Sequence, residues 1–123
     1  MSDIKVVDAS ALAALLFGEP RAAAVAASLE DACLAAPALL PFELANVCLT
    51  KMRRHRAQRK ALRAAFRLAE RLAIETVVVD HEAALDLAEA TGLTAYDASY
   101  LWLARALGAE LVTLDRKLAK VAI

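Results

Sequence analysis

The sequence has only three glycines, two cysteines and two histidines in 123 residues. Neither the P-loop pattern nor GxGxxG occurs, which excludes the glycine-rich loops that bind nucleotide phosphates. His55 and His81 have no serine or cysteine partner at a recognisable spacing, so a nucleophilic triad has no support. Cys33 and Cys48 lie in apolar surroundings, and we expect reduced core residues rather than a disulfide or a metal site.

Long apolar runs are also absent. No run approaches the ~18 residues that a bilayer-spanning helix requires. The N-terminal residues MSDIK are not a basic region followed by a long apolar stretch, so no secretory signal is visible. We therefore expect a soluble, cytoplasmic protein that has no membrane segment.

Apolar residues, and alanine above all, are abundant. Hydrophobic residues make up 60% of the chain and 31 residues are alanine, which excludes disorder and favours closely packed helices. A chain of this length predicts a single domain over residues 1–123.

The zero net charge conceals a strongly basic segment at residues 51–71. This basic segment holds nine Lys or Arg residues and one acid, a charge of +8, whereas the rest of the chain carries −8. Such a distribution indicates an acidic partner such as nucleic acid, although charge runs are often no more than a solvated helix face.

Strand and helix patterns alternate along the chain. Short β-branched or apolar runs predict strands at 4–8, 33–36, 75–79 and 110–113, with helices between them. A helix over roughly 57–72 has an apolar face and an opposite face that carries Arg59, Arg63, Arg67 and Arg71. This alternation predicts an α/β fold whose parallel sheet is covered by helices on both faces.

Five acids are expected at the carboxyl edge of that sheet, where α/β proteins bind ligands. They are Asp8, Glu43, Asp80, Asp97 and Asp115. Each has a structural explanation, as an N-cap, a capping box with Thr94 or a favourable charge at a helix start. As a set, they would repel one another unless a cation were bound, and Mg²⁺ and Mn²⁺ prefer oxygen ligands. Carboxylates around such ions make a phosphoryl-transfer site.

Three segments, taken in order, resemble the PIN-domain family, and specifically the VapC-type toxin ribonucleases of bacterial toxin–antitoxin pairs. They are VVDASALAALLFGEP, LLPFELANVCLTKMRR and LTAYDASYLWLARALGAELVTLDRKLAK. The resemblance implies a three-layer α/β/α sandwich with strand order 3-2-1-4-5. It also implies a Mg²⁺- or Mn²⁺-dependent endoribonuclease that leaves 5′-phosphate and 3′-hydroxyl ends. Because the chain stops at VAI, the fifth strand is expected to be short or missing.

The family's four acids fall on Asp8, Glu43, Asp97 and Asp115, which the resemblance makes the catalytic, metal-binding residues. Ser10, Asn46 and Thr113 fall on supporting positions. Arg59, Arg63 and Arg67 are candidates for RNA binding. The family also implies a homodimer and a cognate antitoxin protein.

The same strand order places Asp80 beside the edge strand, so we expect it to be an N-cap outside the acidic crevice. Tyr96, Tyr100 and Trp102 share one helix and are expected to be core rather than base-stacking residues, although the position of Tyr96 beside Asp97 leaves this open.

Two alternatives to a nuclease are a metal-binding, receiver-like switch and an inert PIN-like domain that only binds a partner. A receiver resembles a different pattern, with two adjacent acids after the first strand and a phosphorylated Asp after the third. Here the first strand ends in Asp8 alone. The intact set of acids argues against an inert domain.

Overall fold

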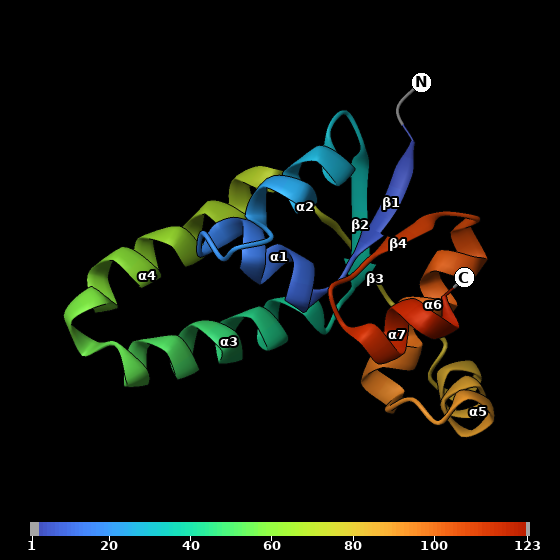
Figure 1. Ribbon diagram of the computed structural model, residues 1–123. Coiled ribbons are helices and arrows are strands. Elements are labelled where there is room, and N and C mark those ends of the chain that lie inside the picture. The colour runs from blue at the N-terminus through green and yellow to red at the C-terminus, as the bar shows by residue number, and fades with distance from the viewer. Residues whose placement is uncertain (1–2, 123) are drawn as a thin grey trace.

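The computed structural model describes residues 3–122, which form a three-layer α/β/α sandwich around a parallel sheet (Figure 1). Strand order is β3-β2-β1-β4, and Val6 of the central strand pairs with Ala35 on one side and Leu111 on the other. The strands are β1 (Ile4–Val7), β2 (Cys33–Pro37), β3 (Glu75–Val77) and β4 (Glu110–Val112). The predicted order is confirmed for these four. Within the described residues no fifth strand follows.

Helices cover both faces of the sheet, which buries the second half of β1. Helix α6 packs on β1, β2 and β4, while α2 contacts β4 and α1 packs on α2 and α3 (Figure 1). The helices are α1 (Ala9–Leu16), α2 (Ala22–Leu29), α3 (Leu40–Arg54), α4 (Arg59–Arg67), α5 (His81–Thr91), α6 (Ala95–Leu107) and α7 (Arg116–Val121), with 3-10 turns η1 (Arg56–Gln58) and η2 (Leu68–Leu72). Val6 and Val7 point to opposite faces, and neither has any exposed surface.

The second half of α3 continues through η1, α4 and η2 as a hairpin, here called the arm (residues 47–72), which projects from the sandwich (Figure 1). No residue of α4 or η2 is buried. At the base of the arm, Lys51 forms an ion pair with Glu19 at 3.5 Å and lies 5.6 Å from the ring centroid of Phe17. The first basic residue of the basic segment is thus tied to the sandwich.

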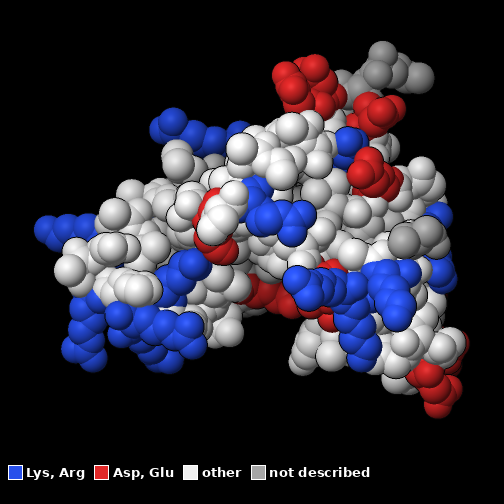
Figure 2. All heavy atoms as spheres, viewed as in Figure 1, with Lys and Arg blue, Asp and Glu red and all other residues white. Residues whose placement is uncertain are grey.

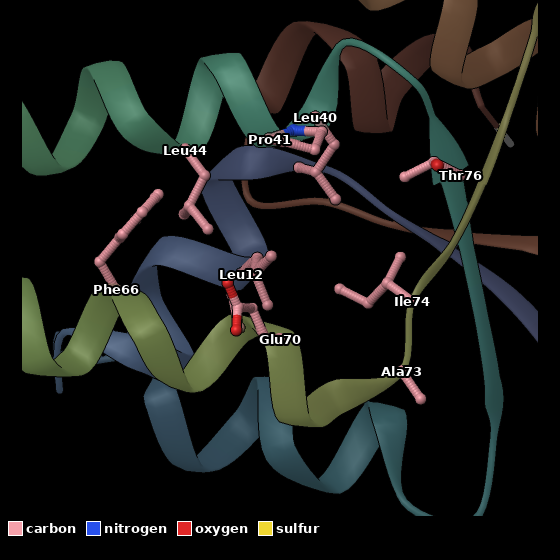
Figure 3. Close-up of a pocket in the computed structure, with 10 residues that line it drawn as sticks. Leu12, Leu40, Pro41, Leu44, Phe66, Glu70, Ala73, Ile74 and Thr76 are labelled. Carbon is pink, nitrogen blue, oxygen red and sulfur yellow. The ribbon is translucent and has the colours of Figure 1, made fainter.

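An apolar cavity of about 270 Å³ lies where the arm meets α1 and the start of α3 (Figure 3). Leu12, Leu40 and Ile74 point into it. Its lining is Leu12, Leu40, Pro41, Leu44, Phe66, Ala69, Glu70, Ala73, Ile74 and Thr76, which includes none of the four candidate site acids. The arm is therefore separated from the sandwich in part by apolar space.

Several expectations need correction. Cys33 is exposed at the start of β2, so only Cys48 is a core residue, and both are free thiols. Tyr96 is 65% exposed and is not a core residue, whereas Tyr100 is 1% exposed. The predicted helix over 57–72 is divided into η1, α4 and η2. None of the helices in residues 3–122 is long and apolar enough to cross a bilayer.

Candidate active site

Asp8 is held at the carboxyl end of β1 by three hydrogen-bond donors. It caps α1, with Oδ1 accepting from the Ala11 amide at 3.0 Å and from the Ser10 hydroxyl at 2.7 Å. Oδ2 accepts from the Thr113 hydroxyl. Because Asp8 is only 4% exposed, these bonds replace the water that its carboxylate would otherwise bind.

The Ser10 and Thr113 hydroxyls connect the segment after β1 to the loop after β4. Each has one proton, which it donates to Asp8. Each hydroxyl oxygen also accepts a hydrogen bond from a backbone amide of the loop after β4. Ser10 Oγ accepts from the Leu114 amide at 2.9 Å, and Thr113 Oγ1 accepts from the Asp115 amide at 3.0 Å. Two of the three predicted supporting residues therefore contact the first acid and fix the loop that carries the last one.

Glu43 lies in the first turn of α3 and is half-buried. Its Oε1 accepts a hydrogen bond of 2.6 Å from the hydroxyl of Tyr100 on α6. Burial, followed by the neighbouring Glu43 carboxylate, raises the pKa of Tyr100, so this hydroxyl stays protonated and acts as the donor. Sequence spacing gave no sign of this contact, because the two residues are 57 positions apart.

Asp97 and Asp115 both lie at helix starts. Asp97 is in the first turn of α6, where its amide donates to the Thr94 hydroxyl at 3.1 Å. Asp115 caps α7, with Oδ1 accepting from the Leu118 amide at 2.8 Å. The predicted cap at Asp115 is thus confirmed, and of the predicted capping box the bond from the Asp97 amide to Thr94 is present. Partial positive charge at these helix ends favours both carboxylates.

The four acids lie close enough for their charges to interact. Burial raises the pKa of Asp8, Glu43 and Asp97 above the ordinary carboxyl range. Repulsion adds to this: Asp115 acts on Asp8 and Asp97, and Asp8 acts on Glu43 and Asp97. Bonds from Thr113, Tyr100 and Thr94 oppose the rise in pKa at Asp8, Glu43 and Asp97 respectively. The predicted set therefore shares one electrostatic environment.

Asp80 is separate from this environment. It is an exposed N-cap of α5, accepting from the Ala83 amide at 3.0 Å, and it follows the edge strand β3. The expectation that it is a structural cap is confirmed. Asn46 lies three residues after Glu43 and is exposed. The structure brings Ser10 and Thr113, but not Asp80, to the carboxylate of Asp8.

The donor set suits a hard divalent cation. Within residues 3–122, no three His, Cys, Asp or Glu side chains are arranged to hold one ion directly. Mg²⁺, however, usually binds through one or two carboxylates and keeps several water molecules, so a wider ring of oxygens is compatible with it. His55 and His81 are exposed, which leaves oxygen atoms as the donors at this edge.

The space-filling view shows where charged side chains gather on this face of the molecule (Figure 2). Lys and Arg side chains gather over the arm, and acidic atoms are visible in the hollow between the arm and the lobe formed by α5, α6 and α7. Arg59, Arg63 and Arg67 are exposed along α4. A polyanion lying in this hollow would therefore have cationic groups on both sides of the acids, on the arm and on α7.

A sequence model of the PIN domain matches residues 5–123, which is nearly the whole chain. The chain belongs to the PIN domain family. This PIN domain is similar to the crystal structure of PAE2754 from Pyrobaculum aerophilum, with a TM-score of 0.74 and 28% identity. The match covers 98% of this chain and 86% of that one. The comparison with curated proteins found no match.

Membership of the family assigns the general chemistry of the fold. PIN domains are generally nucleases, and PIN nucleases usually employ divalent metals. The carboxyl edge of this PIN domain, with its four neighbouring acids, is the place in the described structure where such chemistry fits. The strand order also removes the receiver-like alternative, because β2 lies between β1 and β3, the strand that precedes Asp80.

Proposed function

We propose that this PIN domain is an endoribonuclease that depends on Mg²⁺ or Mn²⁺, and that it is the toxin of a toxin–antitoxin pair. The observation that carries the proposal is the convergence of Asp8, Glu43, Asp97 and Asp115 at one sheet edge, where burial and mutual repulsion raise the pKa of three of them. Such repulsion is relieved when a divalent cation binds among the carboxylates.

Each side chain has a part in this mechanism. When bound, the cation lowers the pKa of an attacking water and stabilises charge on the phosphate. Asp8, Glu43, Asp97 and Asp115 supply the carboxylate oxygens that hold it. Ser10 and Thr113 keep Asp8 in place. Asn46, one turn after Glu43, supports the same set.

RNA is the proposed substrate, and the arm is its proposed guide. Arg59, Arg63 and Arg67 are exposed on one helix, where they can contact successive phosphates. The cognate antitoxin, a homodimer and a cytoplasmic location are part of the same proposal. They follow from the resemblance to VapC-type toxins.

The deciding experiment is incubation of the purified protein with a mixed pool of RNAs, with Mg²⁺ or Mn²⁺ and with excess EDTA. Cleavage should need the metal, and Asp97→Asn should be inactive. Full cleavage in EDTA would contradict the metal mechanism. If the protein binds metal but cuts no RNA, the inert partner-binding alternative is favoured.

The role as a toxin has a separate test. Induced expression of the wild-type chain in bacteria should arrest growth, and expression of Asp97→Asn to the same level should not. Equal arrest by both proteins would show that any toxicity does not come from the acidic site.

A further inference from the structure

Tyr100 is a buried phenol whose hydroxyl reaches the candidate site. It lies on α6, three residues after Asp97, and only 1% of it is exposed. Its hydrogen bond to Glu43 joins α6 to the first turn of α3. One turn of α6 therefore carries both a site acid and the donor that contacts a second site acid.

Packing alone does not account for a tyrosine at this position. A phenylalanine would fill the same volume without a polar atom, whereas a buried hydroxyl is costly unless it has a partner. Glu43 is that partner. Tyr96, four residues earlier on the same helix, shows the contrast, because it is exposed and its hydroxyl can be hydrated.

The bond also restricts Glu43. A glutamate side chain has several rotatable bonds, and fixing it costs roughly 1.5–2 kcal/mol of rotamer entropy. A donor anchored in the core fixes Oε1 when the protein folds, and it leaves Oε2 open to another ligand. The charges of Asp97 and Asp8 act on this carboxylate, so it belongs to the same cluster.

We propose that Tyr100 is a positioning residue, which holds Glu43 oriented toward the other site acids and so prepares the carboxylates for a divalent cation. This inference rests on the proposed metal site. Loss of a group that orients a metal-binding side chain typically reduces metal affinity about 10–100-fold. The same loss is expected for Tyr100→Phe, which removes the hydroxyl and keeps the ring.

The test compares four proteins in calorimetric titrations with Mn²⁺ at one fixed pH: wild type, Tyr100→Phe, Glu43→Gln and the double variant. Tyr100→Phe and Glu43→Gln should each weaken Mn²⁺ binding. If Tyr100 acts through Glu43, the double variant should bind no more weakly than Glu43→Gln alone. Tyr96→Phe is the matched control, since it removes a hydroxyl from the same helix outside this contact, and it should bind Mn²⁺ as the wild type does.

Thermal melts without metal separate positioning from folding. Tyr100→Phe should melt close to the wild type, because Glu43 is half-buried and can be hydrated once its partner is lost. A variant that melts much earlier but binds Mn²⁺ with unchanged affinity when folded would make Tyr100 a packing residue and overturn the inference. Additive losses in the double variant would also overturn it.

The inference and the proposed function fail in different ways. A wild-type protein that does not bind Mn²⁺ contradicts the proposed function, and the metal-related role of Tyr100 with it. If the wild type binds Mn²⁺ and the Tyr100→Phe variant binds it equally well, only the inference about Tyr100 is contradicted.

Discussion

The carboxyl edge of the sheet and the arm both concentrate charge of one sign, but they do so in opposite ways. At the edge, Asp8 is nearly fully buried and accepts three hydrogen bonds from fixed donors. On α4, no residue is buried, and the arginines lie in water at helical spacing. Charge at the edge is costly and is held in place by the fold, whereas charge on the arm costs little and is free to move.

This difference separates two kinds of role. The acids can bind an ion with defined geometry, because neighbouring groups determine where each carboxylate lies. The arginines can attract a polyanion without defined geometry. Lys51 belongs to neither class, since its ion pair with Glu19 ties it to the base of the arm. Substitutions in the two regions should therefore affect different measurements.

The largest effect is expected from Asp97→Asn at the edge. The change keeps the shape of the side chain and removes a charge that would bind the metal. Cleavage should fall by at least about 100-fold, the upper end of the loss seen when a group that only orients a metal ligand is removed. Stability without metal should be unchanged or higher, because repulsion from Asp115 and Asp8 is relieved. Single-turnover cleavage and metal-free melts measure the two effects.

The control is Asp80→Asn, which makes the same change at an exposed cap away from the cluster. It should retain cleavage. If Asp80→Asn were the inactive variant and Asp97→Asn the active one, the assignment of the site would be wrong.

The next effect concerns the arm. Changing Arg59, Arg63 and Arg67 to Gln should weaken RNA binding and flatten its salt dependence, because fewer counterions are released. For three lost phosphate contacts on a single strand, the slope of log K against log salt should fall by about 2. Filter binding over a range of salt concentrations gives this slope, and melting should change little.

Arg21 and Arg105 provide a control for this prediction, since both are exposed and lie outside the arm. Changing them to Gln should leave the slope near the wild-type value. A triple arm variant that keeps the wild-type slope would reduce the basic segment to a solvated helix face.

A smaller effect is expected at Asp80. Asp80→Ala removes the bond to the Ala83 amide and should cost roughly 0.5–2 kcal/mol of stability, the usual range for an N-cap. Turnover by the folded fraction should be unchanged. Urea unfolding, alongside activity per folded molecule, would show whether capping and catalysis are as separate as the geometry indicates.

The smallest expected change is a pH dependence confined to the edge. The pKa values of Asp8, Glu43 and Asp97 are raised, so the folded, metal-free protein binds protons more tightly than the unfolded chain does. Their contribution to stability is complete below the ordinary carboxyl range and is lost as pH rises through the raised values. These groups should therefore make the metal-free protein melt at a higher temperature near about pH 5 than near about pH 7.5, while Mn²⁺ affinity changes in the opposite direction and rises with pH.

Comparison of variants isolates this contribution from the rest of the protein. Asp97→Asn should flatten the dependence of melting temperature on pH, and Arg63→Gln on the arm should leave it unchanged. Equal pH dependence in all three proteins would mean that the acids are not electrostatically coupled.

Sequence reasoning gave the architecture of the fold because its signals are local. Alternating apolar runs predicted the strands, and Gly92 and Gly108 marked helix ends, where both have positive φ as expected. The strand order came from the resemblance and not from any local pattern. The divided helix at 56–72 was missed, because apolar periodicity does not show where the backbone tightens into 3-10 turns.

For the candidate site, the resemblance gave the four acids and named Ser10 and Thr113 as supporting residues, but it did not give the contact that holds Glu43. The caps at Asp80 and Asp115 follow from their neighbours in the chain. The bond from Tyr100 to Glu43 depends on how two helices pack, and no pattern within either helix encodes it. Exposure of Tyr96 and Cys33 was missed for the same reason, since an apolar neighbourhood in sequence does not determine which face of an element is covered.

The hydrogen bond between Asp8 and Thr113 has a consequence for the time at which the site forms. These residues are 105 positions apart, and β4, which pairs with β1, is synthesised after the other three strands. A nascent chain can pair β1 with β2 early, but it cannot fix Asp8 from both sides until Thr113 has left the ribosome. Closing so long a loop also slows this step relative to local helix formation. The acidic edge is thus completed only after β4 has been synthesised, and a chain that stops before Thr113 lacks the arrangement that the proposed cleavage requires.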